Sequence, residues 1–414
     1  MLRASASRTA SLWSRKACRS GTGTAFLSAR YGGRNYSTGE PAVTPIEQLL
    51  LDRIRLAGPI SFATYMQTCL SHPTEGYYMN HKYPVFGTRG DFITSPEISQ
   101  VFGEIIGLWL VSRWMAAGEP AYFRMVELGP GRGTLMADVL GVVNHFIPHS
   151  VQRTLLLVET SPHMRELQRY NIQWPIKWFN SIEEITPVPY VFTMVIAHEF
   201  FDALPMHILQ RTERGWQELQ VAESTSSSAR FQFVLAPPNA MSAVLAHSSE
   251  RFHQLPVGSR IEVSRTGFSI ARRIGEIIEL NESIYSIGGC GLIIDYGGDT
   301  VHSNSFRAFK NHKIVDVFHR PGECDLTANV DFAYLRESMS DIVNVHGPVT
   351  QNHFLKSMHL DRRIRRMVEH ASDDERKEAI RSAAERLADL KGMGTQYKVM
   401  GLTSKEARHP VFPF

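Results

Sequence analysis

Apolar runs alternate with longer amphipathic segments through most of this chain. The runs predict buried strands at 123–126, 154–158, 176–179, 191–197 and 291–294, with a last strand at 394–401. The segments between them repeat apolar residues every three or four positions, which predicts helices. Strands that alternate with helices predict an α/β fold in which helices cover both faces of a parallel sheet.

A helical section is predicted before the first strand, over residues 37–120. Thr44, Pro45 and Glu47 form a helix start, with threonine as the N-cap, proline at the first helical position and glutamate closing a capping box. Pro96 opens a later helix, which we expect to run on to residue 117. This helix should be buried, because apolar residues lie nearly all round it.

The pattern breaks between residues 205 and 255. Two alternating segments, 207–213 and 230–235, flank a linker rich in serine and threonine, and we interpret them as a hairpin insertion. The predicted sheet domain therefore comprises 121–204 and 256–414, with the insertion at 205–255 between its two parts.

The first 36 residues differ in kind from the rest. They contain seven arginine and lysine residues, no acidic residue and many serine and alanine residues. This composition is typical of a mitochondrial transit peptide, here with cleavage after Tyr36, although a basic tail without a targeting role is the alternative. Removing those seven from the 44 basic residues leaves 37 against 41 acidic ones, so we expect no nucleic-acid partner.

The sequence also supports neither a membrane-spanning protein nor a metal-binding protein. No apolar run approaches the length of a membrane span, so we expect no transmembrane segment. The four cysteines lack the spacing of a zinc site, so we expect free thiols and no bound metal.

The first predicted strand ends in a turn with three alternating glycines. Glu127 closes the strand, and Gly129, Gly131 and Gly133 follow before a helix begins. Glycines let such a turn adopt backbone angles that other residues avoid, and they let a ligand approach the backbone. The dinucleotide pattern fails, because Thr134 stands where it needs glycine or alanine. E-x-G-x-G-x-G is instead the S-adenosylmethionine loop of class I, Rossmann-like methyltransferases, in which Glu127 can help to accommodate the sulfonium. A tight turn without a ligand is the alternative.

Glu159 ends the strand that follows the glycine turn. An acidic residue at this place can accept hydrogen bonds from both ribose hydroxyls of a nucleoside. We therefore predict that Glu159 binds the ribose of the cofactor. The alternative is a surface carboxylate at a strand end.

Two carboxylates, Glu199 and Asp202, follow directly after the strand at 191–197. Ligands of open α/β sheets lie beyond the carboxyl ends of the strands, so both side chains should lie near the transferable methyl group. Paired carboxylates match the planar guanidinium of arginine. We predict that Glu199 and Asp202 are catalytic residues that orient a substrate arginine, and we expect His198 to be structural. The alternative is that the two acids only cap the segment after the strand.

Six motifs, in the same order along the chain, resemble the MidA family. They are GYY at 76–78, FGTRGDFITSPEIS at 86–99, VELGPGRGTL at 126–135, HEFFDALP at 198–205, IDYG at 294–297 and DLTANVDF at 325–332. The similarity covers roughly residues 40–400. Together with the predicted transit peptide, the motifs resemble the mitochondrial members of that family.

The resemblance implies an S-adenosylmethionine-dependent protein arginine methyltransferase of the mitochondrial matrix. The implied product is symmetric dimethylarginine on a core matrix-arm subunit of respiratory complex I, and the implied role is assembly of that complex. The cofactor-binding roles fall on Glu127, Gly129, Gly131, Gly133 and Glu159. Two other functions remain open: a non-catalytic assembly chaperone that keeps the methyltransferase fold, and a methyltransferase that acts on RNA or a small metabolite.

Overall fold

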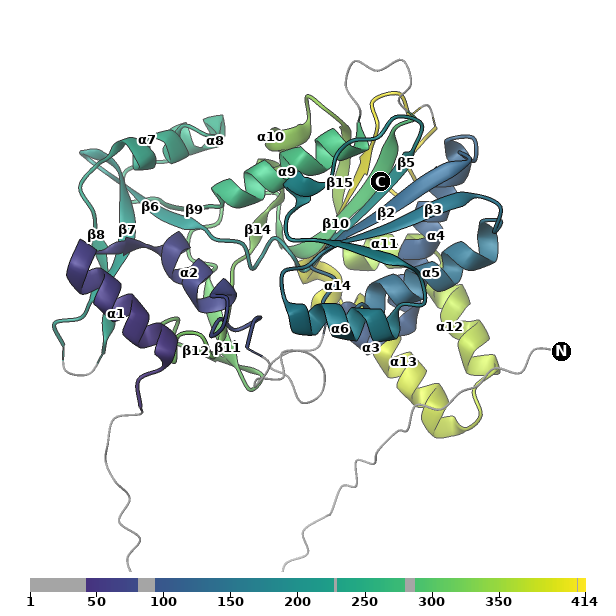
Figure 1. The fold of residues 1–414 in the computed structure, drawn as a ribbon, viewed down its shortest axis with the longest axis horizontal. Coiled ribbons are helices and arrows are strands. Elements are labelled where there is room, and N and C mark those ends of the chain that lie inside the picture. The colour runs from purple at the N-terminus through teal and green to yellow at the C-terminus, as the bar shows by residue number, and fades with distance from the viewer. Residues whose placement is uncertain (1–41, 81–93, 227–228, 280–286, 408) are drawn as a thin grey trace, which may run out of the picture. The chain divides into compact units, whose positions relative to one another are not determined.

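Eight strands form the main sheet of the computed structural model (Figure 1). Their spatial order is β15 (Asn344–Thr350), β16 (Tyr397–Thr403), β10 (Gly289–Gly298), β5 (Phe192–His198), β2 (Tyr122–Leu128), β3 (Gln152–Val158) and β4 (Ile176–Phe179), with β14 (Val330–Asp331) beside β10. The five strands from β10 to β4 run parallel to one another, whereas β16 is antiparallel to both of its neighbours.

The structure describes residues 42–80, 94–226, 229–279, 287–407 and 409–414. Contacts group residues 43–414 into one compact unit. The predicted transit peptide lies outside the described residues, as does the first part of the motif at 86–99, through residue 93.

The predicted α/β class is confirmed, and every predicted strand is present. The last strand begins at Tyr397, because Met393–Gln396 form the short helix α14. The strand that carries the glycine motif, β2, lies between β3 and β5, so the chain order reverses at this point of the sheet. Such a reversal opens a crevice at the carboxyl ends of the strands, where α/β proteins bind ligands.

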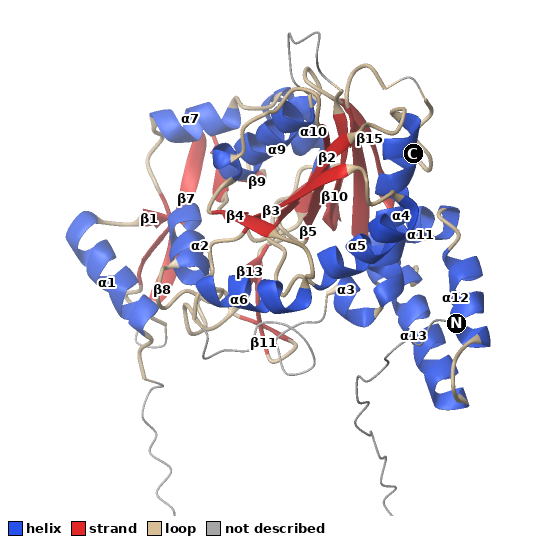
Figure 2. Cartoon of the chain, turned by 45° about the vertical axis from the view of Figure 1, so that its right-hand side comes forward, coloured by secondary structure: helices blue, strands red, loops and turns tan. Residues whose placement is uncertain are grey.

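Helices cover both faces of the main sheet, because successive strand residues point to opposite sides (Figure 2). The covering helices are α4 (Gln100–Ala116) and α5 (Thr134–Phe146) on one face, and α9 (Arg265–Ile278) and α10 (Phe332–Met339) on the other. In β2, Phe123 and Met125 share an apolar cluster with α4 and α5, whereas Val126 and Leu128 share one with α9 and α10. The sheet is therefore buried on both faces.

The N-terminal section forms the helices α1 (Pro45–Ala57), α2 (Phe62–Ser71) and α3 (Ser95–Ile98) before α4. The predicted capping box of α1 is present: the Glu47 amide donates to Thr44 Oγ1 at 3.0 Å, and the Thr44 amide donates to Glu47 Oε2 at 3.2 Å. The long helix predicted after Pro96 is interrupted at Ser99, whose extended backbone ends α3 and whose side chain caps α4. A local cap therefore overrides the apolar pattern.

A second sheet contains the predicted insertion. Its strands are β1 (Ile60–Ser61), β6 (His207–Thr212), β7 (Gly215–Glu223), β8 (Phe231–Leu235) and β9 (Arg260–Val263). The predicted hairpin of two strands was incomplete, because β7 lies between them and pairs with both. The sequence of β7 does not show the alternation of polar and apolar residues that predicts a strand, because the polar Glu218 is buried beside Leu219. Glu218 Oε1 lies 2.5 Å from His207 Nδ1.

The helices α1 and α2 pack against this second sheet and against a small third sheet. The third sheet consists of β11 (Arg307–Lys310), β12 (Lys313–Val315) and β13 (Asp325–Thr327). Buried residues of α1 and α2 share one apolar cluster with Ile208, Val221 and Leu326. The start of the described chain is thus held by segments far along the sequence.

The remaining elements surround these sheets. They are α6 (Pro162–Asn171), the 3-10 helix η1 (Ile182–Glu184), α7 (Ala240–Ala246), α8 (Glu250–His253), α11 (Gln351–Ser357), α12 (Leu360–Glu369) and α13 (Asp374–Ala388). Within the described ranges, no helix has both the length and the apolar character needed to cross a membrane.

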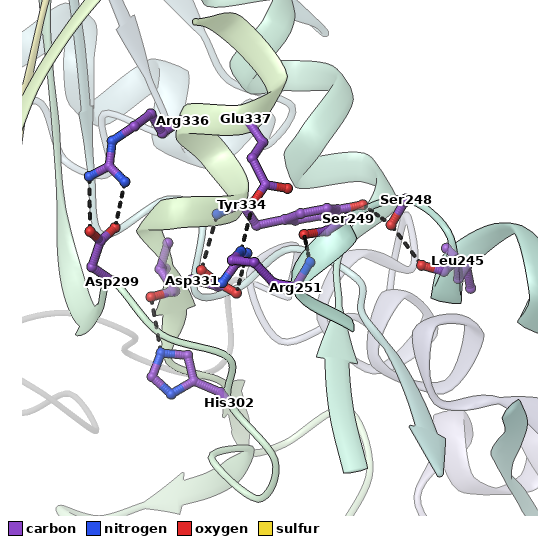
Figure 3. Close-up of polar contacts among 11 residues, drawn as sticks. Leu245, Ser248, Ser249, Arg251, Asp299, His302, Asp331, Tyr334, Arg336 and Glu337 are labelled. Atoms are coloured by element: carbon purple, nitrogen blue, oxygen red, sulfur yellow. Dashed lines mark hydrogen bonds and ion pairs between the residues drawn. The ribbon is translucent and has the colours of Figure 1, made fainter. Parts of the chain in front are cut away.

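A polar network joins α8 to α10. Figure 3 shows Arg251 of α8 between Asp331 and Glu337, with its Nη2 3.0 Å from Asp331 Oδ2 and its Nε 2.6 Å from Glu337 Oε1. The Tyr334 hydroxyl donates to Ser248 Oγ at 2.7 Å. These contacts connect the segment between β8 and β9 of the second sheet to a helix that covers the main sheet.

Arg251→Ala is expected to lower the free energy of unfolding by about 3 kcal/mol, because it leaves the nearly buried Asp331 carboxylate without its cation. Denaturant unfolding followed by circular dichroism measures the change. Arg381→Ala is the matched control, since Arg381 makes an exposed ion pair with Glu378 that should contribute less than about 1 kcal/mol. Equal losses in the two variants would contradict this assignment.

Candidate active site

The carboxyl ends of β2, β3, β5 and β10 border a cavity of about 630 Å³. Among the residues that line it are Glu127, Gly129, Gly131, Glu159, Glu199 and Asp202. Of the predicted site residues, Gly133 stands apart: it is the N-cap of α5, and a Cβ there would lie 2.9 Å from Ile172 Cδ1. The structure therefore brings the other predicted residues together at one hollow and places Gly133 in a packing contact behind the turn.

The glycine turn requires its glycines for conformation and for space. Gly129, Gly131 and Gly133 all have positive φ angles, of 61°, 51° and 79°. Residues with a Cβ seldom adopt this region. A Cβ on Gly129 would also lie 2.9 Å from the ring of Phe200, which belongs to the segment after β5. The turn therefore runs close to the two candidate catalytic acids.

Glu159 is held by the helix that follows it. Its Oε1 accepts from the Ser161 amide at 2.8 Å, and its Oε2 accepts from Gln168 Nε2 at 3.2 Å. Gln168 also donates to the carbonyl of Gly131 at 2.7 Å, so one side chain connects the glycine turn to Glu159. The Glu159 carboxyl thus has a fixed position at the cavity wall.

Glu127 lies deeper and has fewer partners. It is buried at the end of β2, and its Oε2 has no hydrogen-bond partner among the described residues. Burial raises the pKa of Glu127 to about 8, and the nearby charge of Glu159 adds to the effect. A buried carboxyl with an unused oxygen is suited to a ligand that carries positive charge.

Glu199 and Asp202 lie on a tight turn after β5. Glu199 has a φ of 47°, an unusual value for a residue with a side chain, and its amide donates to the carbonyl of Ile294 at 2.9 Å. Burial raises the pKa of Glu199 to about 8, with the Asp202 charge adding to it. Burial raises the pKa of Asp202 to about 6, against the opposing effects of a hydrogen bond from Tyr296 and the charge of Arg307.

Asp295 supports this turn from the neighbouring strand. Its Oδ2 accepts from the Phe201 amide at 3.0 Å and from the Asp202 amide at 3.3 Å. Burial raises the pKa of Asp295 well above its usual value. His198 also lines the cavity and is buried against the ring of Phe102, and burial lowers its pKa to about 3, so the imidazole is neutral at physiological pH.

The cavity also contains residues that sequence patterns did not indicate as site residues. They are Tyr78, Arg307, Asp325, Thr327 and Tyr397. These residues come from separate segments, and only the tertiary fold brings them together. Tyr78, Asp325 and Thr327 lie in motifs that resemble those of the MidA family, and Tyr397 lies within the predicted last strand, which was the available signal.

Comparison with known proteins gives the fold first. One solved structure is a protein of Burkholderia thailandensis with bound S-adenosyl-homocysteine, which is 23% identical to this chain. The match covers 88% of this chain and 95% of the Burkholderia chain, with a TM-score of 0.71. This likeness confirms the predicted Rossmann-like sheet.

The family follows from sequence comparison. The family model described as "Putative S-adenosyl-L-methionine-dependent methyltransferase" matches residues 105–349. The mouse protein "Protein arginine methyltransferase NDUFAF7, mitochondrial" is 36% identical over 93% of this chain and 91% of its own length. The zebrafish (Danio rerio) protein of the same name is 40% identical over 76% of each. The chain therefore belongs to the MidA-like family of S-adenosyl-L-methionine-dependent methyltransferases.

Proposed function

We propose that the protein is a protein arginine N-methyltransferase of the mitochondrial matrix that forms symmetric dimethylarginine on a matrix-arm core subunit of complex I and so supports assembly of that complex. The observation that carries this proposal is the pair of acids at the cavity beside the glycine turn: Glu199, whose side chain is 11% exposed, and the buried Asp202. The names of the relatives support arginine as the residue that is methylated and mitochondria as the location. The resemblance of the six motifs to the MidA family supports a complex I subunit as the substrate. Residues 1–36 would direct import, and the sheet domain would bind the cofactor.

The residues present fit S-adenosyl-L-methionine. Gly129 allows close approach to the backbone, because a Cβ at that position would fill the space next to Phe200. Glu159 would hold the ribose, and the unused Oε2 of Glu127 would face the positively charged part of the cofactor. When bound, the cofactor supplies an activated methyl group on a sulfonium.

The substrate arginine would be oriented by the acids after β5. An arginine guanidinium is protonated at neutral pH, so the site needs alignment and charge stabilisation more than a strong base. Glu199 and Asp202 would accept N–H bonds from the guanidinium and hold its positive charge away from the nitrogen that receives the methyl group. Asp295 fixes both acids indirectly, through the Phe201 and Asp202 amides.

Glu127→Gln is expected to flatten the pH dependence of cofactor affinity. The raised pKa keeps the Glu127 carboxyl neutral at low pH and lets it ionise as the pH rises through about 8. Affinity for the cationic S-adenosyl-L-methionine should therefore rise by up to about tenfold per pH unit below that value, and less for S-adenosyl-homocysteine, which lacks the sulfonium charge. Calorimetric titration of both ligands measures the ratio of the two affinities, and a ratio in the wild type that does not change with pH would argue against this role.

Methyl-arginine mass spectrometry of complex I subunits, with and without the protein, tests the proposal directly. We expect a subunit arginine that is symmetrically dimethylated only when the protein is present. Expressing the Asp202→Asn variant in cells that lack the protein distinguishes an enzyme from an assembly chaperone. Complex I assembly that survives without the methyl mark would favour the chaperone, whereas a methylated RNA or metabolite in place of arginine would reassign the substrate.

A further inference from the structure

Tyrosine hydroxyls donate to two of the carboxyls at the cavity. Tyr78 donates to Asp325 Oδ1 at 2.7 Å, and Tyr296 donates to Asp202 Oδ2. The proposed function uses Glu199 and Asp202 and leaves the pair of Asp325 and Tyr78 without a role.

Asp325 lies close to the two acids after β5 although it belongs to another sheet. It begins β13, is buried and lines the cavity. At the end of β13 the Ala328 amide donates to the carbonyl of Asp202 at 3.0 Å, which ties the strand to the catalytic turn. The negative charge of Asp325 also acts on Glu199 and on Tyr296. Carboxyls from β13 and from the segment after β5 therefore share one hollow.

Besides Glu127 Oε2, three buried oxygens of the cavity lining have no hydrogen-bond partner in the described part of the chain. They are Glu199 Oε1, Asp202 Oδ1 and Thr327 Oγ1. Buried polar atoms are almost always hydrogen-bonded, so unused carboxylate oxygens of this kind indicate a ligand that donates, and the threonine hydroxyl can accept from the same ligand. Acceptors lie on each side: Glu199 and Asp202 after β5, and Thr327 at the end of β13.

The cation beside Asp202 is committed to other contacts. Arg307 Nη1 donates to the carbonyl of Ser305 at 3.1 Å and to Asn329 Oδ1 at 2.9 Å, and its guanidinium lies 4.9 Å from the centre of the Tyr296 ring. Arg307 therefore lies against the Tyr296 side of the cavity, and Asp202 Oδ1 and Thr327 Oγ1 have no hydrogen bond from it. A second planar cation with several N–H donors would satisfy acceptors on both sides, which a compact ammonium would not.

We propose that Asp325 and Thr327 form the second wall of the substrate subsite, so that the guanidinium is held between them and the acids Glu199 and Asp202. This inference rests on the proposed arginine methyltransferase function and deepens it. Tyr78 is a positioning residue, because its hydroxyl holds the Asp325 carboxyl at the wall of the cavity.

Binding of ethylguanidinium, the end group of an arginine side chain, tests the proposal. The full-length protein saturated with S-adenosyl-homocysteine is titrated by calorimetry, with ethylammonium as the compact cation for comparison. We expect Asp325→Asn to weaken ethylguanidinium binding about tenfold and Thr327→Val to weaken it about threefold, with unchanged affinity for S-adenosyl-homocysteine in both. Asp325→Glu should restore part of the loss, and Asp299→Asn, at an exposed ion pair with Arg336, should change nothing.

The outcomes separate this inference from the function on which it rests. If the wild type binds ethylguanidinium and both Asp325→Asn and Thr327→Val bind it equally well, the second wall is refuted while the proposed function stands. If the wild type does not prefer ethylguanidinium to ethylammonium, both are refuted. Thr327→Val, which removes a hydroxyl and keeps the shape of the side chain, decides the question if Asp325→Asn fails to fold.

Discussion

Gly129→Val is expected to weaken affinity for S-adenosyl-homocysteine by about 100-fold or more. Gly129 has a φ of 61°, and a β-branched residue in this region adds strain on the order of 1–3 kcal/mol. The new side chain would also displace the ring of Phe200, which lies 2.9 Å from the Cβ position. Because Phe200 lies between Glu199 and Asp202 in the sequence, the turn and the acids should shift together. Isothermal titration calorimetry measures the loss.

Gly141→Val is the matched control for this substitution. Gly141 lies in α5, the helix that begins at the glycine turn, and a Cβ there meets nothing within 4 Å. The same added side chain should leave cofactor affinity within about twofold of the wild type, since exposed helix positions tolerate such changes. Equal affinity in Gly129→Val and Gly141→Val would mean that the turn does not contact the cofactor.

Asp202→Asn is expected to lower the turnover number for arginine methylation by about 100-fold to 1,000-fold, while affinity for S-adenosyl-homocysteine stays within about threefold. The substitution removes one charge that stabilises the guanidinium during transfer, and fixed charges of this kind contribute effects of that size. It also alters the bond from Tyr296. Steady-state methyl transfer to the proposed substrate, an isolated complex I subunit, measures turnover, and calorimetry measures cofactor affinity.

A surface aspartate provides the comparison for Asp202. Asp341 is exposed and lies 3.1 Å from Arg272 Nη2, away from the cavity-lining residues. Asp341→Asn should leave turnover unchanged. If Asp202→Asn retained the turnover of Asp341→Asn, the acid would have only a structural part, as a cap of the segment after β5.

The local parts of this fold could be predicted from the sequence. The strands of the main sheet are buried on both faces, so they appear as apolar runs, and the capping box at Thr44 is a pattern of neighbouring residues. The glycine turn is also local, because backbone conformation dictates its residues. The sequence therefore indicated the acids Glu127 and Glu159 at the ends of the first two strands.

The parts that depend on tertiary contacts could not be predicted in the same way. The strand β7 contains the buried Glu218, which is stable there because His207 of the adjacent strand pairs with it. Asp325 and Tyr78 are far apart in the sequence and meet only after β13 and α2 have packed. Both lie in MidA-like motifs, but no pattern of neighbouring residues gives either one a chemical role, and so both were absent from the predicted set.

The pairing of β1 with β7 has a consequence for how the protein is made. Ile60 pairs with Val221, so the apolar faces of α1 and α2 stay uncovered until that distant strand has folded against them. Contacts between such distant residues slow folding and expose the incompletely folded chain to aggregation. A chain that ends before β7 should therefore stay bound to holding chaperones through its first two helices, whereas the full-length chain should be released.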